Sequence, residues 1–207
     1  MFKNRHEAGI LLAEKLQKYR GGDAVVLALP RGGVVVGRAV ADALSLPLDI
    51  IATRKIGHPS NPEYAIGAVD AHGLSVFNEA EVASVDARWL KEETEKQMKE
   101  AKRRTSVYRK GKNPTALAGK IVIIVDDGIA TGFTVRLATK VAQKEHAKKI
   151  IVAVPVAPLE AVDEIKQEGA DEVILLEPPE DFFGAVGAHY QEFEQVEDQE
   201  VINLMNS

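Results

Sequence analysis

The stretch from Ile121 to Thr134 constrains the fold of this chain more than any other segment. Residues 121–125 are five consecutive aliphatic residues, a pattern typical of a strand buried on both faces of a parallel sheet. Two acids follow at once, Asp126 and Asp127, then a short loop of small residues, and then an apolar pattern with helical spacing. The segment therefore predicts a strand, a tight loop and a helix, the unit from which open α/β sheets are built.

The loop in this unit predicts an anion-binding site. Backbone N–H groups at the start of a helix have no partner within the helix, and the helix dipole adds partial positive charge. Thr131 and Thr134 can add hydroxyl donors. Asp126 and Asp127 would repel a phosphate unless they face sugar hydroxyls or a divalent cation. A phosphate joined to a ribose with free 2′ and 3′ hydroxyls satisfies both the loop and the acids.

A bare Asp-Asp also follows strands of Rossmann type and solvated strand ends, but the complete pattern is more specific. It resembles the phosphoribosyl-pyrophosphate signature of the type I phosphoribosyltransferases, in which an apolar run and two acids precede a loop ending in Thr-Gly-x-Thr. The resemblance implies that Asp126 and Asp127 hold the ribose hydroxyls and that the loop amides hold the 5′-phosphate. That loop consists of Gly128, Ile129, Ala130, Thr131, Gly132, Phe133 and Thr134.

Two further strand ends suit the same ligand. Arg31, Gly32 and Gly33 follow a predicted strand at 24–29, and Arg54 and Lys55 follow another at 48–53. Ligands of open α/β sheets bind outside the carboxyl ends of the strands, and arginine binds phosphate in a bidentate manner. Both segments are similar in sequence to the adenine and orotate branches of the family. That similarity implies that Arg31, Gly32 and Gly33 form the pyrophosphate loop and that Arg54 and Lys55 contact pyrophosphate.

The resemblance also implies catalytic roles. It puts a mobile lid at roughly Ile56 to Asp70, and the Gly and Pro residues of 57–64 predict a loop there, followed by a hairpin across 71–73. Arg54 and Lys55 are expected to stabilise the departing pyrophosphate, and Glu63 or His58 to serve as a general acid or base. Mg²⁺ is the expected cofactor, near Asp126 and Asp127 but with no direct protein ligand assigned.

Ala130 bears on the nucleobase. Hypoxanthine–guanine enzymes carry a third carboxylate at this place in the signature, whereas adenine- and uracil-type members resemble this chain in having alanine. We therefore expect hypoxanthine and guanine to be poor substrates. The aromatic residues Phe182, Phe183 and Tyr190 are either a platform for the base or anchors of a C-terminal cap.

The length of 207 residues fits a single domain. The alternation of predicted strands and helices indicates an α/β fold, an open and mainly parallel sheet flanked by helices, with a small cap. We expect a core of residues 1–78 and 113–177, a helical insertion at 79–112 and a cap at 178–207. The resemblance covers about residues 24–176. The chain has no Cys, no leader pattern and no apolar run of membrane-spanning length, so we expect a cytoplasmic protein.

The net charge of −5 argues against a general nucleic-acid binder. Residues 88–112 nevertheless carry ten basic residues against four Glu. A solvated helix face explains the first half, whereas Arg103, Arg104, Arg109 and Lys110 have fewer neighbouring acids and could face a polyanionic ligand.

Two functions remain open. The first is an enzyme whose partners are phosphoribosyl pyrophosphate and a nucleobase-like acceptor, with a homodimer as one option for its assembly. The second is a non-catalytic regulator that binds the same sugar phosphate and acts through the basic 88–112 helix. A kinase or a dehydrogenase is disfavoured, because the chain has neither a Gly-x-x-x-x-Gly-Lys nor a Gly-x-Gly-x-x-Gly loop.

Overall fold

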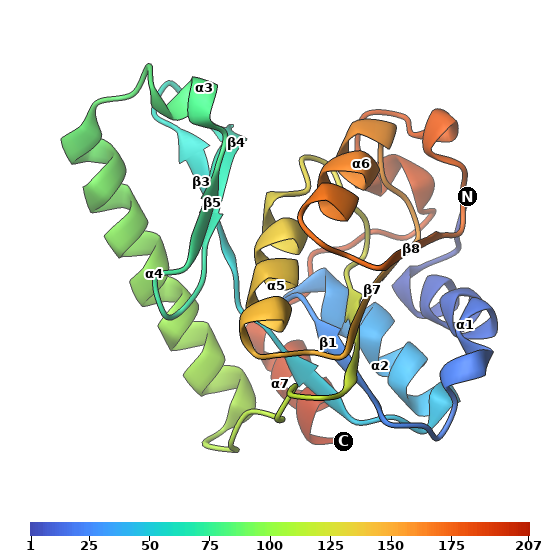
Figure 1. Ribbon diagram of the computed structural model, residues 1–207. Helices are drawn as coiled ribbons and strands as arrows, with labels where there is room; N and C mark the ends of the chain where they lie inside the picture. Colours follow the sequence, from blue (N-terminus) through green and yellow to red (C-terminus); the bar gives the residue numbers. More distant parts are fainter.

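The core of the protein is a five-stranded parallel sheet with the strand order β2-β1-β6-β7-β8 (Figure 1). The computed structural model describes residues 1–207. Every neighbouring pair of strands in this sheet is parallel. The open parallel α/β fold expected from the sequence is therefore confirmed. The strands are β1 (Ala24–Ala28), β2 (Leu48–Ile50), β6 (Ile121–Val125), β7 (Lys149–Val154) and β8 (Glu172–Leu175).

Two pairs of helices cover the two faces of this sheet, because successive residues of a strand point to opposite sides. α1 and α2 pack on the face that carries Ile123, and α5 and α6 pack on the face that carries Ile124. Both faces are apolar, which explains why the central strands are uninterrupted aliphatic runs. The helices are α1 (Arg5–Lys15), α2 (Gly32–Leu44), α5 (Phe133–Lys144) and α6 (Leu159–Gln167), and a single 3-10 turn, η1 (Gln17–Tyr19), follows α1.

A second, antiparallel sheet follows β2 in the chain and has the order β3-β4-β5. Its strands are β3 (Arg54–His58), β4 (Asn61–Val69) and β5 (Ser75–Phe77). The hairpin predicted between β4 and β5 is confirmed, but the loop predicted at 57–64 is wrong. Only Pro59 and Ser60 separate β3 from β4, and the ring of His58 binds Ser60 across this turn. Pro62 fits within β4 because β5 pairs only with the other end of that strand.

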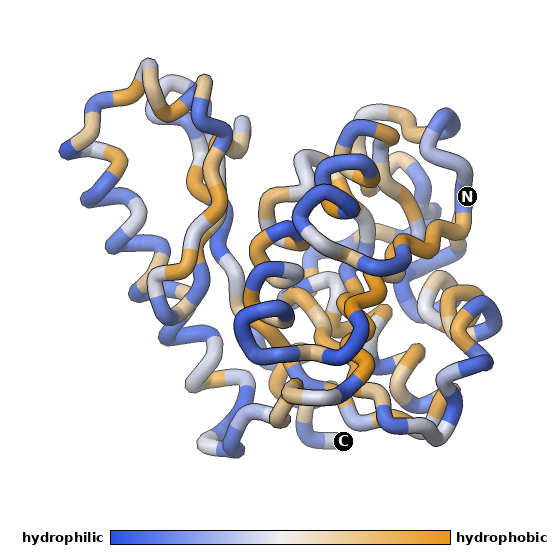
Figure 2. The backbone as a smooth tube through the Cα atoms, viewed as in Figure 1, coloured by the Kyte–Doolittle hydropathy of each residue, from blue (hydrophilic) through white to orange (hydrophobic).

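The helical insertion consists of a short helix, α3 (Glu79–Val82), and a long one, α4 (Ala87–Arg109). Asp86 caps α4, since its carboxylate accepts a hydrogen bond of 2.8 Å from the Trp89 amide. Trp89, Leu90 and Met98 pack α4 onto the second sheet. Residues 54–109, which we call the arm, stand beside the core in Figure 1, and Figure 2 shows the strongly hydrophilic character of α4.

Most of the basic residues in the second half of α4 have acidic partners. Arg103 and Arg104 both bind Glu100, and Arg109 binds the buried Asp49 of β2. Few acids lie near Arg109 in the sequence, as noted above, but the fold gives it an acidic partner that lies 60 residues earlier in the chain.

The C-terminal segment returns across the core as the predicted cap. It contains the 3-10 turns η2 (Pro179–Asp181) and η3 (Val186–His189) and the helix α7 (Asp198–Asn206). Tyr190 pairs with Phe2 in an isolated bridge, and α7 packs through Val201 against Tyr108 of α4 and against α2. Phe2 and the C-terminal segment around Tyr190 therefore meet beside the carboxyl edge of the core sheet, whereas the C-terminus itself lies elsewhere, after α7 (Figure 1). None of the helices combines the length and the apolarity that crossing a lipid bilayer requires.

Gly9 marks the closest approach of α1 to α2, and it provides a test of this packing. A β-carbon there would lie 2.6 Å from the Ala39 β-carbon and 2.7 Å from the Val36 carbonyl oxygen. Gly9→Ala should lower the free energy of unfolding by about 1 kcal/mol, because overpacking of roughly 1–3 kcal/mol exceeds the gain of about 1 kcal/mol in helix propensity. Urea denaturation measures the difference. Gly22→Ala, whose β-carbon meets no atom closer than 3.3 Å, is the control and should be nearly neutral. Equal stability of Gly9→Ala and the unmodified protein would contradict this packing.

Candidate functional site

The two acids of the 121–134 segment lie against the first turn of α2. Asp126 and Asp127 follow the carboxyl end of β6, and α2 begins at Gly32, after the neighbouring β1. A β-carbon on Gly32 would overlap Asp127 Oδ2, and one on Gly33 would lie 2.8 Å from Asp126 Oδ1. The absence of side chains at both positions thus lets the helix start approach the carboxylates. Its partial positive charge stabilises them there.

Arg5, the first residue of α1, binds the second acid. Its Nε lies 2.7 Å from Asp127 Oδ2, with both side chains largely buried. The guanidinium lies 3.8 Å from the centroid of the Phe193 ring, and it also donates to the Glu194 carbonyl. From the cap, the Tyr190 hydroxyl donates to the Asp127 carbonyl oxygen at 2.6 Å. The N-terminal helix and the C-terminal cap therefore both hold Asp127 in place.

Arg5 was not predicted to belong to the site, because it lies 122 residues before Asp127 in the chain. One local signal was available. Arg5 begins α1 directly after its cap residue Asn4, a position where the helix dipole favours acids over bases. A cation at such a position indicates a partner elsewhere in the fold.

Asp126 has a strongly perturbed acidity. Burial raises the pKa of its carboxyl well above the usual value, and the Asp127 carboxylate raises it further. Asp127 N donates to Asp126 Oδ1, Arg5 donates to Asp127 Oδ2, and the two carboxyl groups lie within hydrogen-bonding reach of each other. No protein N–H binds the second oxygen of either acid. Each acid thus retains one oxygen for a ligand. A perturbed acid beside free acceptors at a sheet edge is a candidate functional group.

The loop after the acids is an anion cradle at the N-terminus of α5. Gly132 has a φ of 76°, in the left-handed region, and precedes the helix. The backbone amides of residues 130–135 donate no hydrogen bond within the protein. Ile129 differs from its neighbours, because its side chain is buried in the core and its amide donates to Val156. Six consecutive amides therefore remain for an anion at the positive end of a helix dipole.

The predicted pyrophosphate residues lie partly together. Arg31 precedes α2 after a cis Pro30–Arg31 peptide, and its Nη1 lies 3.6 Å from Asp198 of α7. Arg54 donates from Nε to Gln97 of α4 at 3.0 Å. Burial lowers the pKa of the Arg54 guanidinium, and the nearby charges of Arg104 and Arg31 lower it further. The charges of three arginines, from the loop between β1 and α2, from β3 and from α4, thus act on one another, and the ion pairs of Arg31 with Asp198 and of Arg104 with Glu100 offset part of their repulsion.

Lys55 and Glu63 are separated from this cluster. Successive strand residues face opposite sides, so Lys55 points away from the α4 side that Arg54 occupies. Opposite Lys55 in the sheet is Ala68, which packs against α5. Lys55 Nζ binds the exposed Glu63 at 2.7 Å, and this contact lowers the pKa of Glu63. The structure therefore brings Arg31 and Arg54 together and leaves Lys55 on the other face of the arm.

The three aromatic candidates lie in the cap. Tyr190 is buried against Phe2 and Phe193, and Phe182 stacks on His189. Phe183 also stacks on this histidine, and it stays largely exposed. Tyr190 therefore anchors the cap, as one of the two sequence interpretations has it.

Metal binding by protein side chains alone receives little support from the geometry. No group of three or more His, Cys, Asp or Glu side chains is arranged to hold an ion. Mg²⁺, however, is held in many sites by one or two carboxylates together with substrate phosphates and water. The free oxygens of Asp126 and Asp127 fit that limited role.

Comparisons with known proteins agree on one family. A family model of the phosphoribosyl transferase domain matches residues 4–192. Two Mycobacterium tuberculosis proteins, "Putative phosphoribosyl transferase MT0597" of strain CDC 1551 and "Putative phosphoribosyl transferase Rv0571c" of strain H37Rv, are each 41% identical over 208 residues. The match covers 100% of this chain and 46% of each relative, so the chain spans about half their length. The crystal structure of TT1426 from Thermus thermophilus superposes with a TM-score of 0.81 and 41% identity, over 99% of this chain and 97% of that chain.

The raised pKa of Asp126 predicts a pH-dependent cost in stability. A carboxyl whose folded pKa exceeds its unfolded value binds more protons in the folded state, so stability falls as pH rises between the two values. Asp126→Asn cannot ionise and should gain stability over the unmodified protein as pH rises from about 4 towards 8. Each unit of pKa difference corresponds to about 1.4 kcal/mol, or roughly 3–6 °C in melting temperature.

Thermal melts across this pH range check the expectation. The exposed Asp163 of α6 provides the control, since it makes no ion pair, and Asp163→Asn should differ from the unmodified protein by a constant amount. A pH-independent difference for Asp126→Asn would contradict the raised pKa.

Proposed function

Because the chain belongs to the phosphoribosyl transferase family, we propose that it transfers the 5-phosphoribosyl group of phosphoribosyl pyrophosphate to a nitrogenous base, releasing pyrophosphate. The observation that carries this proposal is the order of complementary groups at one sheet edge. Six free amides suit a phosphate, the acid pair suits a ribose diol, and three arginines suit a pyrophosphate.

The acid pair supports a diol more than a phosphate. Asp126 Oδ2 and Asp127 Oδ1 are free acceptors, one for each of two neighbouring hydroxyls. Arg5 offsets the charge of Asp127, which reduces the repulsion between the acids and a nearby phosphate. Arg5 and Tyr190 also fix the position of Asp127, and a fixed position lowers the entropy lost when the sugar binds.

The arginine cluster supports binding of the leaving group. Arg31, Arg54 and Arg104 approach the site from three different elements, and their mutual repulsion would be relieved by a dianion. Developing negative charge on pyrophosphate would be stabilised by the same guanidinium groups. Mg²⁺, held by substrate oxygens, water and the acid pair, would neutralise part of that charge.

The reaction should be ionic, with the ribosyl–oxygen bond largely broken before the nitrogen of the base attacks. The protein would then act through positioning and charge stabilisation. The exposed tip of the β3–β4 hairpin, residues 59–64, is the segment suited to close over the ligand and exclude water. The lowered pKa of Glu63 favours the ionised form, which suits a base and not an acid.

The proposal is tested by measuring pyrophosphate release from phosphoribosyl pyrophosphate and Mg²⁺ with adenine, hypoxanthine, guanine, uracil and orotate. We expect turnover with at least one base, and slow turnover of hypoxanthine and guanine because Ala130 has no proton-transferring group. Saturable binding of the sugar phosphate without turnover would instead support the regulator. Absence of binding would overturn both functions, and efficient use of hypoxanthine or guanine would refute the argument from Ala130.

The arginine cluster gives a second prediction. Arg54→Ala and Arg104→Ala should each weaken pyrophosphate binding roughly tenfold or more, because each removes a charge-assisted hydrogen bond. Ribose 5-phosphate binding should be almost unchanged, since that ligand lacks the pyrophosphate group. Calorimetric titration measures both ligands.

Lys55→Ala is the matched control, because Lys55 neighbours Arg54 in β3 but faces the other side. It should leave pyrophosphate binding nearly unaffected. Equal losses for all three variants would show that the cluster has no special role.

A further inference from the structure

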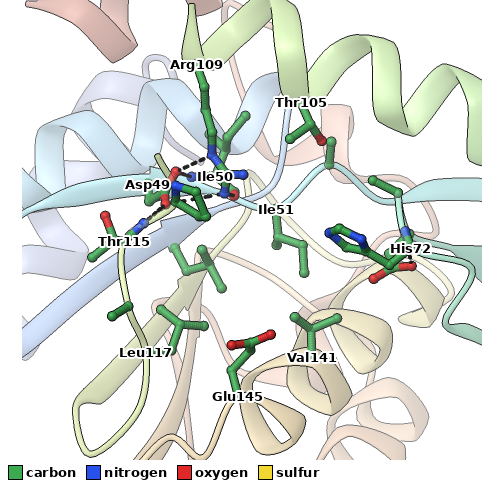
Figure 3. Close-up of a pocket in the computed structure, with 16 residues that line it drawn as sticks. Asp49, Ile50, Ile51, His72, Thr105, Arg109, Thr115, Leu117, Val141 and Glu145 are labelled. Carbon is green, nitrogen blue, oxygen red and sulfur yellow. Dashed lines mark hydrogen bonds and ion pairs between the residues drawn. The ribbon is translucent and has the colours of Figure 1, made fainter. Parts of the chain in front are cut away.

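A cavity of about 200 Å³ lies where the arm meets the core (Figure 3). Its walls come from β1, β2, the β4–β5 turn, α4, the loop before β6 and the end of α5. An engineered cavity of about 150 Å³ in another protein holds benzene, so this volume suits a molecule with one ring and not a nucleotide.

The cavity is separate from the candidate active site. Val141 and Glu145 line it from the last turn and the end of α5, whereas the anion cradle is at the first turn of the same helix. A helix of 12 residues is about 18 Å long, so α5 keeps the two places apart by roughly that distance.

One wall of the cavity is an ion pair in which both carboxylate oxygens already accept hydrogen bonds. The buried Asp49 carboxylate accepts hydrogen bonds from Arg109, from its neighbour Ile50 and from the Thr115 amide. Figure 3 shows these groups on one side of the open space. Asp49 and Arg109 cancel in charge and close that end of the cavity.

Asp70, in the β4–β5 turn, has a different environment. Asp70 is only 5% exposed, and no cation pairs with it. Oδ1 accepts the amides of His72 and Leu74, whereas Oδ2 has no protein donor. Asp70 lines the cavity, and its Oδ2 retains some accessible surface. Asp70 therefore brings an unpaired, accessible carboxylate oxygen to the lining of the cavity. A buried carboxylate of this kind is stabilised by a cationic or N–H donor.

Further features of the cavity favour a cation. Glu145 is an exposed residue of the lining that has no ion-pair partner and caps the end of α5, where the negative end of the helix dipole adds to its charge. The remaining titratable groups of the lining are the Asp49–Arg109 pair and the exposed His72. Ile51, Leu117 and Val141 present apolar surface between these polar groups, as Figure 3 shows.

We propose that this cavity binds a small organic cation, an amine or amidine carried on a body of about one ring. The charged head lies at Asp70 and Glu145, and the ring lies against Ile51, Leu117 and Val141. This proposal is independent of the transferase activity, because it uses none of the residues of the sugar-phosphate site.

The test uses benzamidine as the probe and benzamide as its neutral, nearly isosteric control, each titrated into the full chain by two-dimensional NMR. Benzamidine should bind saturably with a dissociation constant of roughly 1 mM or tighter, and shift the amides of Asp70, His72 and Val141. Benzamide should bind at least tenfold more weakly, because it lacks the charge.

Two variants locate the binding. Asp70→Asn keeps the Oδ1 acceptor of the turn but removes the charge, and it should weaken benzamidine binding tenfold or more. Val141→Phe fills the cavity and should abolish binding of both probes. Asp163→Asn, an exposed acid on α6, should change nothing.

Three results would overturn the proposal. The first is no saturable binding of benzamidine. The second is equal affinity for benzamide, which would show that charge is not recognised. The third is unchanged affinity in a folded Val141→Phe protein, checked by its melting temperature, which would place the probe elsewhere.

Discussion

The approach of α2 to the acid pair is the contact on which the rest of the site depends. It requires glycine at Gly32 and Gly33, because any side chain there would displace the carboxylates. It also concentrates two negative charges in a partly buried place, which is unfavourable without compensation. The compensation comes from the helix start, from Arg5 and from the Asp127 amide. Arg5 is in turn held by Phe193 and Glu194 of the cap, so the two ends of the chain complete the site.

At the carboxyl edge of the core sheet, the groups that favour anions lie apart from the two acids. Free amides and the dipole of α5 lie on one side of the acids, and the cluster of Arg31, Arg54 and Arg104 is supplied by the loop after β1, by β3 and by α4. Arg54 and Arg104 belong to the arm, and Arg31 contacts Asp198 of α7. The arm therefore supplies two of the three arginines of this cluster. Its hairpin tip carries Glu63 and His58, whose contacts in this structure are with Lys55 and Ser60.

Helix α5 connects the two places that the structure singles out. Its first turn forms the anion cradle, and its last turn forms part of the cavity between arm and core. The arm packs on the N-terminal half of this helix, where Ala65, Ala68 and Val76 of the second sheet meet Phe133 and Leu137 of α5. Opposite ends of the α5 dipole are thus directed at the anion cradle and at the cavity. The positive end suits an anion and the negative end suits a cation.

Local sequence patterns suffice to predict the parallel sheet and the succession of strands and helices along the chain. They also suffice for the acid pair after β6, the cradle before α5 and the cap on α4. Those features depend on local rules, namely aliphatic runs, helix termini and capping residues, so neighbouring residues suffice to specify them. The sequence prediction failed at 57–64, where Gly and Pro residues indicated a loop and the chain forms a hairpin stabilised by its packing on α4. Other contacts arise only from tertiary packing. Arg5 binds Asp127, Asp49 binds Arg109, and Lys55 faces away from Arg54. These contacts join residues up to 122 positions apart or depend on which face of a strand is covered, and no local pattern carries that information.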